Sequence, residues 1–328
     1  MPSTEDQTSS PKVDEFDRHT VTGDQLVKSI IVNGGVIIRN FLDIDAVKTI
    51  EHDVRPYIDA DKSWSGEFFP KQTRRVTGLA AKSPTFLNSM IMDPLWNYLT
   101  RSLLTSRHTS WAGQEQHTSV SLPQVSATIV FSIGPGAKDQ VLHRDDGNSH
   151  NVLPEITIDQ YKPARDETIG LFVAGSKTTR QNGATRFVPR SHLQHTFTKP
   201  PNDSVDPDVC IYAEMDPGDA FMMLGSCYHG GSANKTVDQE RLVFATFSTK
   251  GYLRQEENQY LVLSKEQVLS LDEATQRELG YSVSEPYVGW IEYTQPFLYL
   301  KDGIKRHDDL AGQIAKTEEG FRDVKVVA

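Results

Sequence analysis

The feature that most restricts the fold of this chain is a change in hydrophobic periodicity near residue 122. Before this point, apolar residues recur every three to four positions, which is the spacing of amphipathic helices. After it, short runs alternate apolar and polar residues, as in VSATIVFSI at 125–133, and such alternation predicts strands with one buried face. Many short strands separated by turn signals are typical of an antiparallel sandwich or barrel. We therefore expect a mostly β core flanked by helices.

Two helical segments are predicted in the N-terminal third. Asp43 can cap a helix whose apolar residues share one stripe, namely Ile44, Val47, Ile50, Val54 and Ile58. A second apolar run, 86–103, also has helical spacing, and Pro94 should break or kink it because proline lacks the backbone N–H that an interior turn needs.

Further strands are predicted by short apolar runs between turn residues, at 139–145, 168–174, 184–189, 210–214, 219–224 and 241–249. A helix should follow them, since Ser264 and Gln267 form a capping box and Gly280 is a plausible stop. No linker divides the chain, so we expect one domain over 23–300, a flexible N-terminal arm over 1–22 and a charged C-terminal tail over 301–328.

Composition excludes several classes of protein. The net charge of −10 argues against nucleic acid as the main partner, and no apolar run approaches the roughly 18 residues of a membrane span. The acidic N-terminus lacks the features of a signal or transit peptide. Only two cysteines occur, Cys210 and Cys227, which fits a reducing compartment and excludes a thiolate metal site. We therefore expect a cytoplasmic protein that acts on a small molecule.

Three residues form a candidate metal site. His143 and Asp145 in VLHRDDGNSH are two positions apart, so on a strand both side chains would point the same way. His229 follows the strand-like run AFMMLGSCY. Two imidazoles and one carboxylate are the facial triad of non-haem Fe(II) oxygenases, which leaves open coordination positions. The spacing favours Asp145 over its neighbour Asp146.

Two other interpretations of these three residues are open. An isolated His-x-Asp pair is common by chance, and catalytic zinc also accepts two histidines and a carboxylate. Against zinc, the chain has no His-Glu-x-x-His motif.

Arg241 begins the predicted strand RLVFATFS, and its same-face neighbours are apolar. A guanidinium pointing into an apolar interior needs an anionic partner, and one carboxylate of a small dicarboxylate would supply it. The alternative is an ordinary exposed arginine at the end of a strand.

Taken together, these segments make the chain resemble the phytanoyl-CoA dioxygenase-like iron(II)/2-oxoglutarate oxygenases. The resemblance runs from about 24 to 300 and is closest to the fungal branch that tailors terpenoid, meroterpenoid and alkaloid natural products. It rests on the order and spacing of FFPKQTRRVTGL (68–79), GPGAKDQVLHRDD (134–146), NGATRFVPRSH (182–192), DPGDAFMMLGSCYHGGSAN (216–234) and RLVFATFSTKGYLRQEENQYL (241–261).

The resemblance implies a double-stranded β-helix core, the jelly-roll of cupin-like proteins, and roles for six residues. The residues that match the iron ligands of the family are His143, Asp145 and His229. Arg241 and Thr185 match positions that bind the distal carboxylate of 2-oxoglutarate. Gln140 matches a glutamine that contacts the co-substrate in some members, but simple alternation puts it on the face opposite His143, so this role requires a bulge.

The activity implied by the resemblance is an oxidation that uses Fe(II), 2-oxoglutarate and O2. An apolar polycyclic secondary metabolite of a fungal pathway would be hydroxylated, desaturated or rearranged, and the enzyme would be a homodimer. Other readings are a metal-dependent hydrolase, a redox-neutral isomerase on the same scaffold, or a non-catalytic binding protein.

Overall fold

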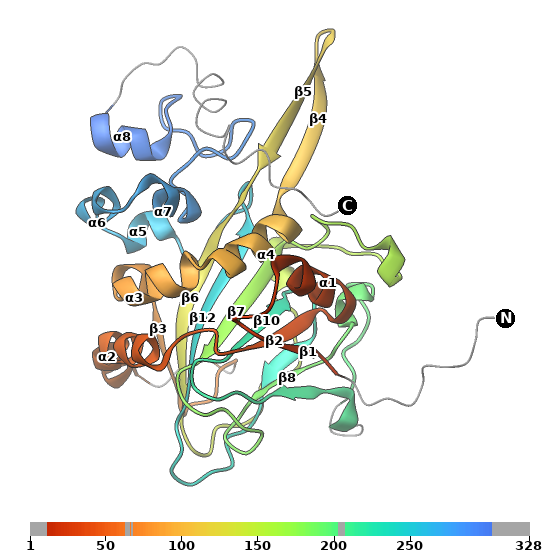
Figure 1. Ribbon diagram of the computed structural model, residues 1–328, viewed down its shortest axis with the longest axis vertical. Helices are drawn as coiled ribbons and strands as arrows, with labels where there is room; N and C mark the ends of the chain where they lie inside the picture. Colours follow the sequence, from red (N-terminus) through yellow and green to blue (C-terminus); the bar gives the residue numbers. More distant parts are fainter. Residues whose placement is uncertain (1–11, 63–65, 67, 203–206, 304–328) are drawn as a thin grey trace, which may run out of the picture.

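Strands form the centre of the molecule (Figure 1), for which the computed structural model describes residues 12–62, 66, 68–202 and 207–303. The large sheet has seven strands in the spatial order β1 (Asp14–Asp17), β2 (Gly35–Arg39), β10 (Ala220–Leu224), β7 (Thr168–Ala174), β12 (Arg241–Lys250), β6 (Pro123–Ile133) and β3 (Thr73–Thr77). A smaller sheet follows the order β11 (His229–Gly231), β8 (Thr185–Phe187) and β9 (Ile211–Ala213). A separate hairpin pairs β4 (Ser106–Ala112) with β5 (Glu115–Ser121) and projects from one end of the fold.

The middle of the large sheet is β12, which pairs antiparallel with β6 on one side and β7 on the other. Its residues are mostly β-branched, aromatic or small and are almost all buried, as expected for a strand with neighbours on both sides. At its start, Arg241 lies opposite Ile133 of β6. The strands predicted at 125–133, 168–174 and 241–249 are thus confirmed, with ends that differ by at most two residues.

Helices flank the strands. Along one side of the large sheet lie α2 (Ile44–Ala60), α3 (Pro84–Phe86), α5 (Gln259–Val262), α6 (Lys265–Ser270), α7 (Glu273–Glu278) and α8 (Pro296–Asp302). Helix α1 (Gly23–Asn33) packs against α4 (Pro94–Leu104) and β2. Short 3-10 or π turns are η1 (Leu79–Ala81), η2 (Leu87–Ile91), η3 (Asp146–Ser149), η4 (Ile158–Gln160), η5 (Ser191–Leu193) and η6 (Pro207–Val209).

The predicted helices form where their caps place them. The Asp43 carboxylate accepts from the N–H of Ala46 at 2.7 Å, and four of the five stripe residues of α2 are buried, whereas Ile44 is exposed. Pro94 breaks the second apolar run and opens α4, since proline suits the first helical position.

Three predictions need correction. The segment 139–145 is not a strand and forms only one bridge, between His143 and His229. The helix expected up to Gly280 is two short helices, α6 and α7, because Asp272 caps a new helix that begins at Glu273, its carboxylate accepting from the N–H of Thr275.

The third correction concerns the N-terminal arm, which the sequence predicted to reach residue 22. Residues 1–11 lie outside the described residues, but Asp14–Asp17 form β1 and pair in parallel with β2 at the edge of the large sheet. The expected tail over 301–328 also falls outside the described residues from 304 onwards, and α8 extends to Asp302.

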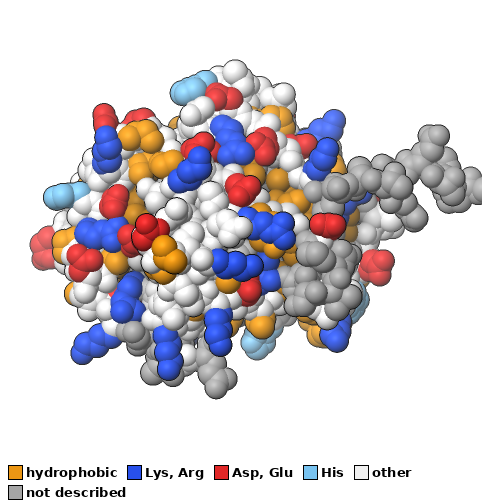
Figure 2. Space-filling model, turned by 90° about the horizontal axis from the view of Figure 1, so that it is seen from below, with side chains coloured by type: hydrophobic (Ala, Val, Ile, Leu, Met, Phe, Trp, Pro, Cys, Tyr) orange, Lys and Arg blue, Asp and Glu red, His pale blue; other side chains and the backbone are white. Residues whose placement is uncertain are grey.

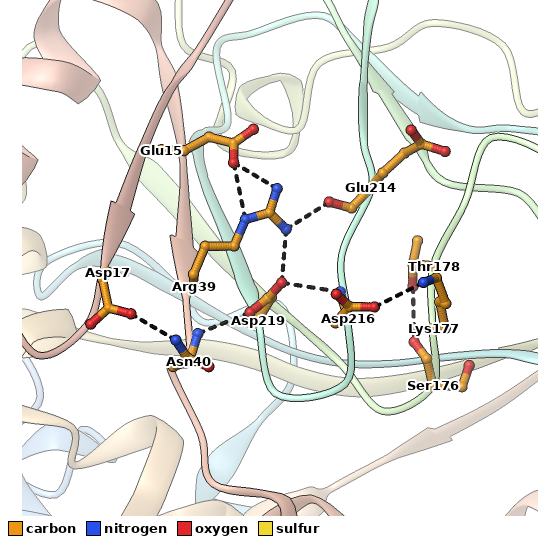
Figure 3. Close-up of polar contacts among 10 residues, drawn as sticks. All are labelled: Glu15, Asp17, Arg39, Asn40, Ser176, Lys177, Thr178, Glu214, Asp216 and Asp219. Carbon is orange, nitrogen blue, oxygen red and sulfur yellow. Dashed lines mark hydrogen bonds and ion pairs between the residues drawn. The ribbon is translucent and has the colours of Figure 1, made fainter.

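Polar contacts around Arg39 explain why the N-terminal segment joins the sheet (Figure 3). The Arg39 guanidinium contacts Glu15 of β1 at 2.6 Å and Asp219, at the start of β10, at 2.7 Å. Asp219 also accepts from the N–H groups of Asn40 and Asp216, at 2.9 and 3.0 Å. Burial alone would lower the pKa of Arg39, but its hydrogen bonds to Asp219 and Glu15 raise it overall. The cationic side chain of Arg39 in β2 therefore links β1 to the start of β10.

The surface carries both signs of charge. On the face seen in Figure 2, Lys and Arg side chains are interspersed with Asp and Glu. A continuous basic patch is typical of nucleic-acid binding, and this face does not show one. Among the described residues, no helix combines the length and the apolar character that crossing a bilayer requires.

Replacing Arg39 with Met should lower the free energy of unfolding by about 1–3 kcal/mol, because the nearly buried Asp219 carboxylate loses its cationic partner. Chemical denaturation of the wild type and the variant would measure this difference in the free energy of unfolding. Lys48→Met is the control: Lys48 and Asp45 are both exposed and 3.9 Å apart, so this change should cost less than about 0.5 kcal/mol. Equal losses for both variants would contradict the account.

Candidate metal centre

Three candidate ligands from distant parts of the chain meet at one end of the β core. The Nε2 atoms of His143 and His229 lie 3.7 and 3.5 Å from the two carboxylate oxygens of Asp145. One ligand atom from each of the three residues lies within 4.8 Å of the others. In the described part of the chain, this is the one group of His, Cys, Asp and Glu with such geometry.

Main-chain hydrogen bonds bring the two histidines together. The N–H of His143 donates to the carbonyl of His229 at 2.9 Å, and the N–H of His229 donates back at 3.0 Å. Asp145 then enters a helical turn, with φ −86° and ψ −23°, which leads into η3. The side chains therefore converge through a bridge followed by a turn, and not through the continuous strand that the sequence predicted.

Both imidazoles present the same nitrogen to the site. The Nδ1 atom of His143 lies 2.9 Å from the Val141 carbonyl, and that of His229 lies 3.1 Å from the Cys227 carbonyl. A carbonyl can only accept, so each Nδ1 carries the proton and each Nε2 keeps its lone pair. Burial lowers the pKa of His229, which favours the neutral form that a metal requires.

The donor set fits a divalent iron site. Two neutral nitrogens and one carboxylate oxygen suit Fe(II), and three ligands on one side leave positions open toward the cavity. This cavity has a volume of about 590 Å³ and contains all three side chains in its lining.

Arg241 occupies the interior position expected of it. The side chain is buried, and its Nη2 donates to the Thr185 hydroxyl at 2.9 Å. Among the described residues no carboxylate pairs with it, and its buried Nε has no hydrogen-bond partner. Burial lowers the pKa of Arg241 to about 10, so the group is still cationic at neutral pH. A buried cation of this kind fits an anionic ligand in the cavity.

Gln140 reaches the cavity because the chain contains the bulge that its role required. The Gln140 N–H donates to the Gly231 carbonyl at 2.9 Å, and His143 bridges His229. Between these two paired positions the first segment advances by three residues (143 − 140) and the second by two (231 − 229). The first segment therefore carries one extra residue, which is a bulge. The Gln140 side-chain oxygen also accepts from the N–H of Gly231 at 2.9 Å, and a Cβ at Gly231 would lie 3.0 Å from that oxygen.

Several residues near the candidate ligands in the sequence or in space are not themselves members of the ligand cluster. Asp146 is buried, does not line the cavity, and has a pKa raised to about 6 by burial. His192 is buried and its Nε2 lies 3.0 Å from the Ile31 carbonyl, so it is a hydrogen-bonded interior residue and not part of the ligand cluster. Phe68, which begins the matching segment 68–79, packs edge-on against His143, with ring centroids 5.3 Å apart.

Most of the cavity wall was not singled out by the sequence. Its apolar side chains include Phe69, Ile129, Phe131, Ile133, Phe172 and Phe247, and polar or charged side chains such as Thr73, Lys138 and Glu257 lie among them. The usable signal was alternation, because residues 129, 131 and 133 share one face of β6. Glu256 and Asn148 also line the cavity; Glu256 comes from a loop and Asn148 from the short turn η3, and no local pattern predicts their positions.

Among solved structures, the chain is similar to the non-haem α-ketoglutarate-dependent carbocyclase SnoK from nogalamycin biosynthesis. The TM-score is 0.52 at 16% identity, covering 75% of this chain and 92% of that one. Such a likeness shows the fold, and it confirms the predicted class: a mostly β jelly-roll with flanking helices.

Sequence comparison identifies the family within that fold. Residues 32–242 match the phytanoyl-CoA dioxygenase (PhyH) family. The chain is 37% identical to the dioxygenase himG of Aspergillus japonicus over 290 residues, which cover 86% of this chain and 88% of that protein. It is 38% identical to the dioxygenase peniF of Penicillium patulum, over 84% of this chain and 88% of that protein. The chain belongs to the phytanoyl-CoA dioxygenase family.

The enzyme is therefore a 2-oxoglutarate-dependent non-haem iron dioxygenase, as predicted, with Fe(II), 2-oxoglutarate and O2 as its cofactor and co-substrates. This result disfavours the hydrolase, isomerase and binding-protein readings.

Arg241→Gln should raise the KM for 2-oxoglutarate about 10- to 100-fold, because a hydrogen bond to a charged group contributes roughly 1.5–3 kcal/mol. Succinate formation at varied 2-oxoglutarate concentration measures it. Lys138→Gln is the matched control, since Lys138 lines the same cavity but is exposed. Equal changes in KM for the two variants would show that Arg241 does not bind the co-substrate.

Proposed function

We propose that His143, Asp145 and His229 hold Fe(II) and that Arg241, Thr185 and Gln140 hold 2-oxoglutarate. The observation that carries this proposal is the juxtaposition of a His-Asp-His cluster and a buried guanidinium without a carboxylate partner in one cavity. When bound, iron and 2-oxoglutarate activate O2 for the oxidation of a substrate C–H bond.

The residues of the protein would then bind and orient the iron and 2-oxoglutarate and shield them from water. The Val141 and Cys227 carbonyls keep Nε2 of each histidine directed at the metal position. Thr185 holds the Arg241 fork in place, which would fix the end of the co-substrate farthest from the iron. Phe68 covers one face of the site at His143. Holding reactants in one geometry and excluding water are the main contributions of a protein to chemistry of this kind.

The wall of the cavity supports an apolar polycyclic substrate. Phe172 and Phe247 contact each other edge-on with centroids 5.4 Å apart, and Phe69 lies 6.0 Å from Phe131. Aromatic walls and a volume of about 590 Å³ suit a ligand of several fused rings. Because himG and peniF come from filamentous fungi, we further propose a terpenoid, meroterpenoid or alkaloid intermediate of fungal secondary metabolism.

Asp145→Ala should abolish both metal binding and 2-oxoglutarate turnover, because the carboxylate supplies the one anionic ligand. Co(II) binding and succinate formation would be measured, with exposed Asp159→Ala as control. Full turnover in Asp145→Ala would overturn the ligand assignment.

With wild-type enzyme, a panel of fungal polycyclic intermediates should increase succinate formation, and stimulation only by small polar acids would contradict the proposed substrate.

We also propose a cytoplasmic homodimer. Both cysteines are buried and neither forms a disulfide, which suits a reducing compartment. For the dimer, the support is an exposed aromatic pair in which Trp290 stacks on Tyr293 with centroids 4.4 Å apart, in a segment of the chain where Tyr287 is also exposed. Sedimentation should give about twice the monomer mass of 36.7 kDa. A monomer at all protein concentrations would contradict the dimer.

A further inference from the structure

The turn that joins β10 to β11 contacts two of the three candidate ligands through its main chain. We call residues 224–228 the ligand turn. Its Gly225 carbonyl accepts from the N–H of Asp145 at 2.8 Å and from that of Asp146 at 3.2 Å. The Cys227 carbonyl contacts Nδ1 of His229 at 3.1 Å. The ligand turn therefore decides where the Asp145 side chain starts and which nitrogen of His229 faces the site.

Between these two carbonyls lies Ser226, whose side chain is fully buried and hydrogen-bonds to the Asp166 carboxylate. The other oxygen of Asp166 accepts from the hydroxyl of Tyr161 at 2.6 Å. Asp166 is itself fully buried, and no salt bridge in the described ranges reaches it, although Arg165 and His192 interact with it electrostatically. A buried carboxylate is costly unless it is hydrogen-bonded, so the two hydroxyls contribute directly to where it lies.

Close packing would transmit any movement of the ligand turn to the candidate ligands. A Cβ placed on Gly225 would lie 2.1 Å from Cγ2 of Thr168 and 3.4 Å from Cβ of Asp145. The Gly225 N–H also donates to the Thr168 carbonyl at 2.9 Å. Gly225 thus lies between Thr168 and Asp145 with no free space, and a shift at Ser226 cannot be absorbed there.

We propose that Asp166 is a positioning residue of the metal centre: through Ser226 it holds the ligand turn, and the carbonyls of that turn hold Asp145 and His229. The inference rests on the proposed function, in which these two residues bind the metal. Asp166 does not line the cavity, so its effect passes through the ligand turn and not through substrate contact.

The test uses Co(II) as the probe, with its Kd and visible absorption spectrum as readouts in the full-length protein. Ser226→Ala should weaken Co(II) binding about 10- to 100-fold, which is the usual effect of losing a partner outside the ligand shell, and should shift the spectrum. Tyr161→Phe, which removes the other donor and keeps the ring, should act in the same direction. It keeps the proposal testable if Ser226→Ala fails to fold.

Ser83→Ala is the matched control. Ser83 is also fully buried and donates to a carboxylate, that of Asp53, at 2.7 Å, but it caps α3. This variant should lose stability while its Co(II) affinity stays within twofold of wild type. Wild-type affinity in Ser226→Ala and Tyr161→Phe, or an equal loss in Ser83→Ala, would overturn the role of Asp166. Failure of the metal assignment would look different, because Asp145→Ala would then bind Co(II) like wild type.

Discussion

The candidate metal centre depends on one pair of main-chain hydrogen bonds, those exchanged between His143 and His229. Each residue donates to and accepts from the other, so two segments separated by 86 residues (229 − 143) are held side by side. Once these backbones are paired, the turn after His143 delivers Asp145, and the bulge before it delivers Gln140. Main-chain pairing needs no particular side chains, which leaves the side chains free for chemistry.

The second feature that organises the cavity is the buried guanidinium of Arg241, which pairs with no carboxylate among the described residues. Arg241 stands at the start of the central strand β12, between β6 and β7, so the sheet itself carries it into the interior. Thr185 of the small sheet accepts from one of its N–H groups, and Arg241 is among the residues that line the cavity. The large sheet thus supplies a cation to the cavity lining, and the small sheet supplies His229, one of the three candidate metal ligands. This arrangement suits a dianionic co-substrate that must contact both the cation and the metal.

The accuracy of the sequence predictions follows the physical origin of each signal. Helix α2 and strands β6, β7 and β12 were predicted because their apolar residues repeat with the period of the element. Strand β2 was missed, since GVIIR is short and apolar without alternation. The hairpin of β4 and β5 was missed for the opposite reason: almost all of its side chains are exposed, so burial imposes no pattern on its sequence. The predicted N-terminal arm shows a further limit, because Glu15, one of its charged residues, pairs with Arg39, and Asp17 accepts from Asn40.

The amino-acid sequence by itself determined the donor types of the site and the class of the fold. The two histidines and the aspartate were picked out by residue type, spacing and the resemblance to a family, and the interior arginine by the alternation of its strand. Only the tertiary structure decided how these residues meet. The bulge at Gln140, the ligand turn held by Asp166 and the aromatic wall of the cavity arise from contacts between segments far apart in the chain. Such contacts depend on the register and packing of whole sheets, and no short stretch of sequence carries that information.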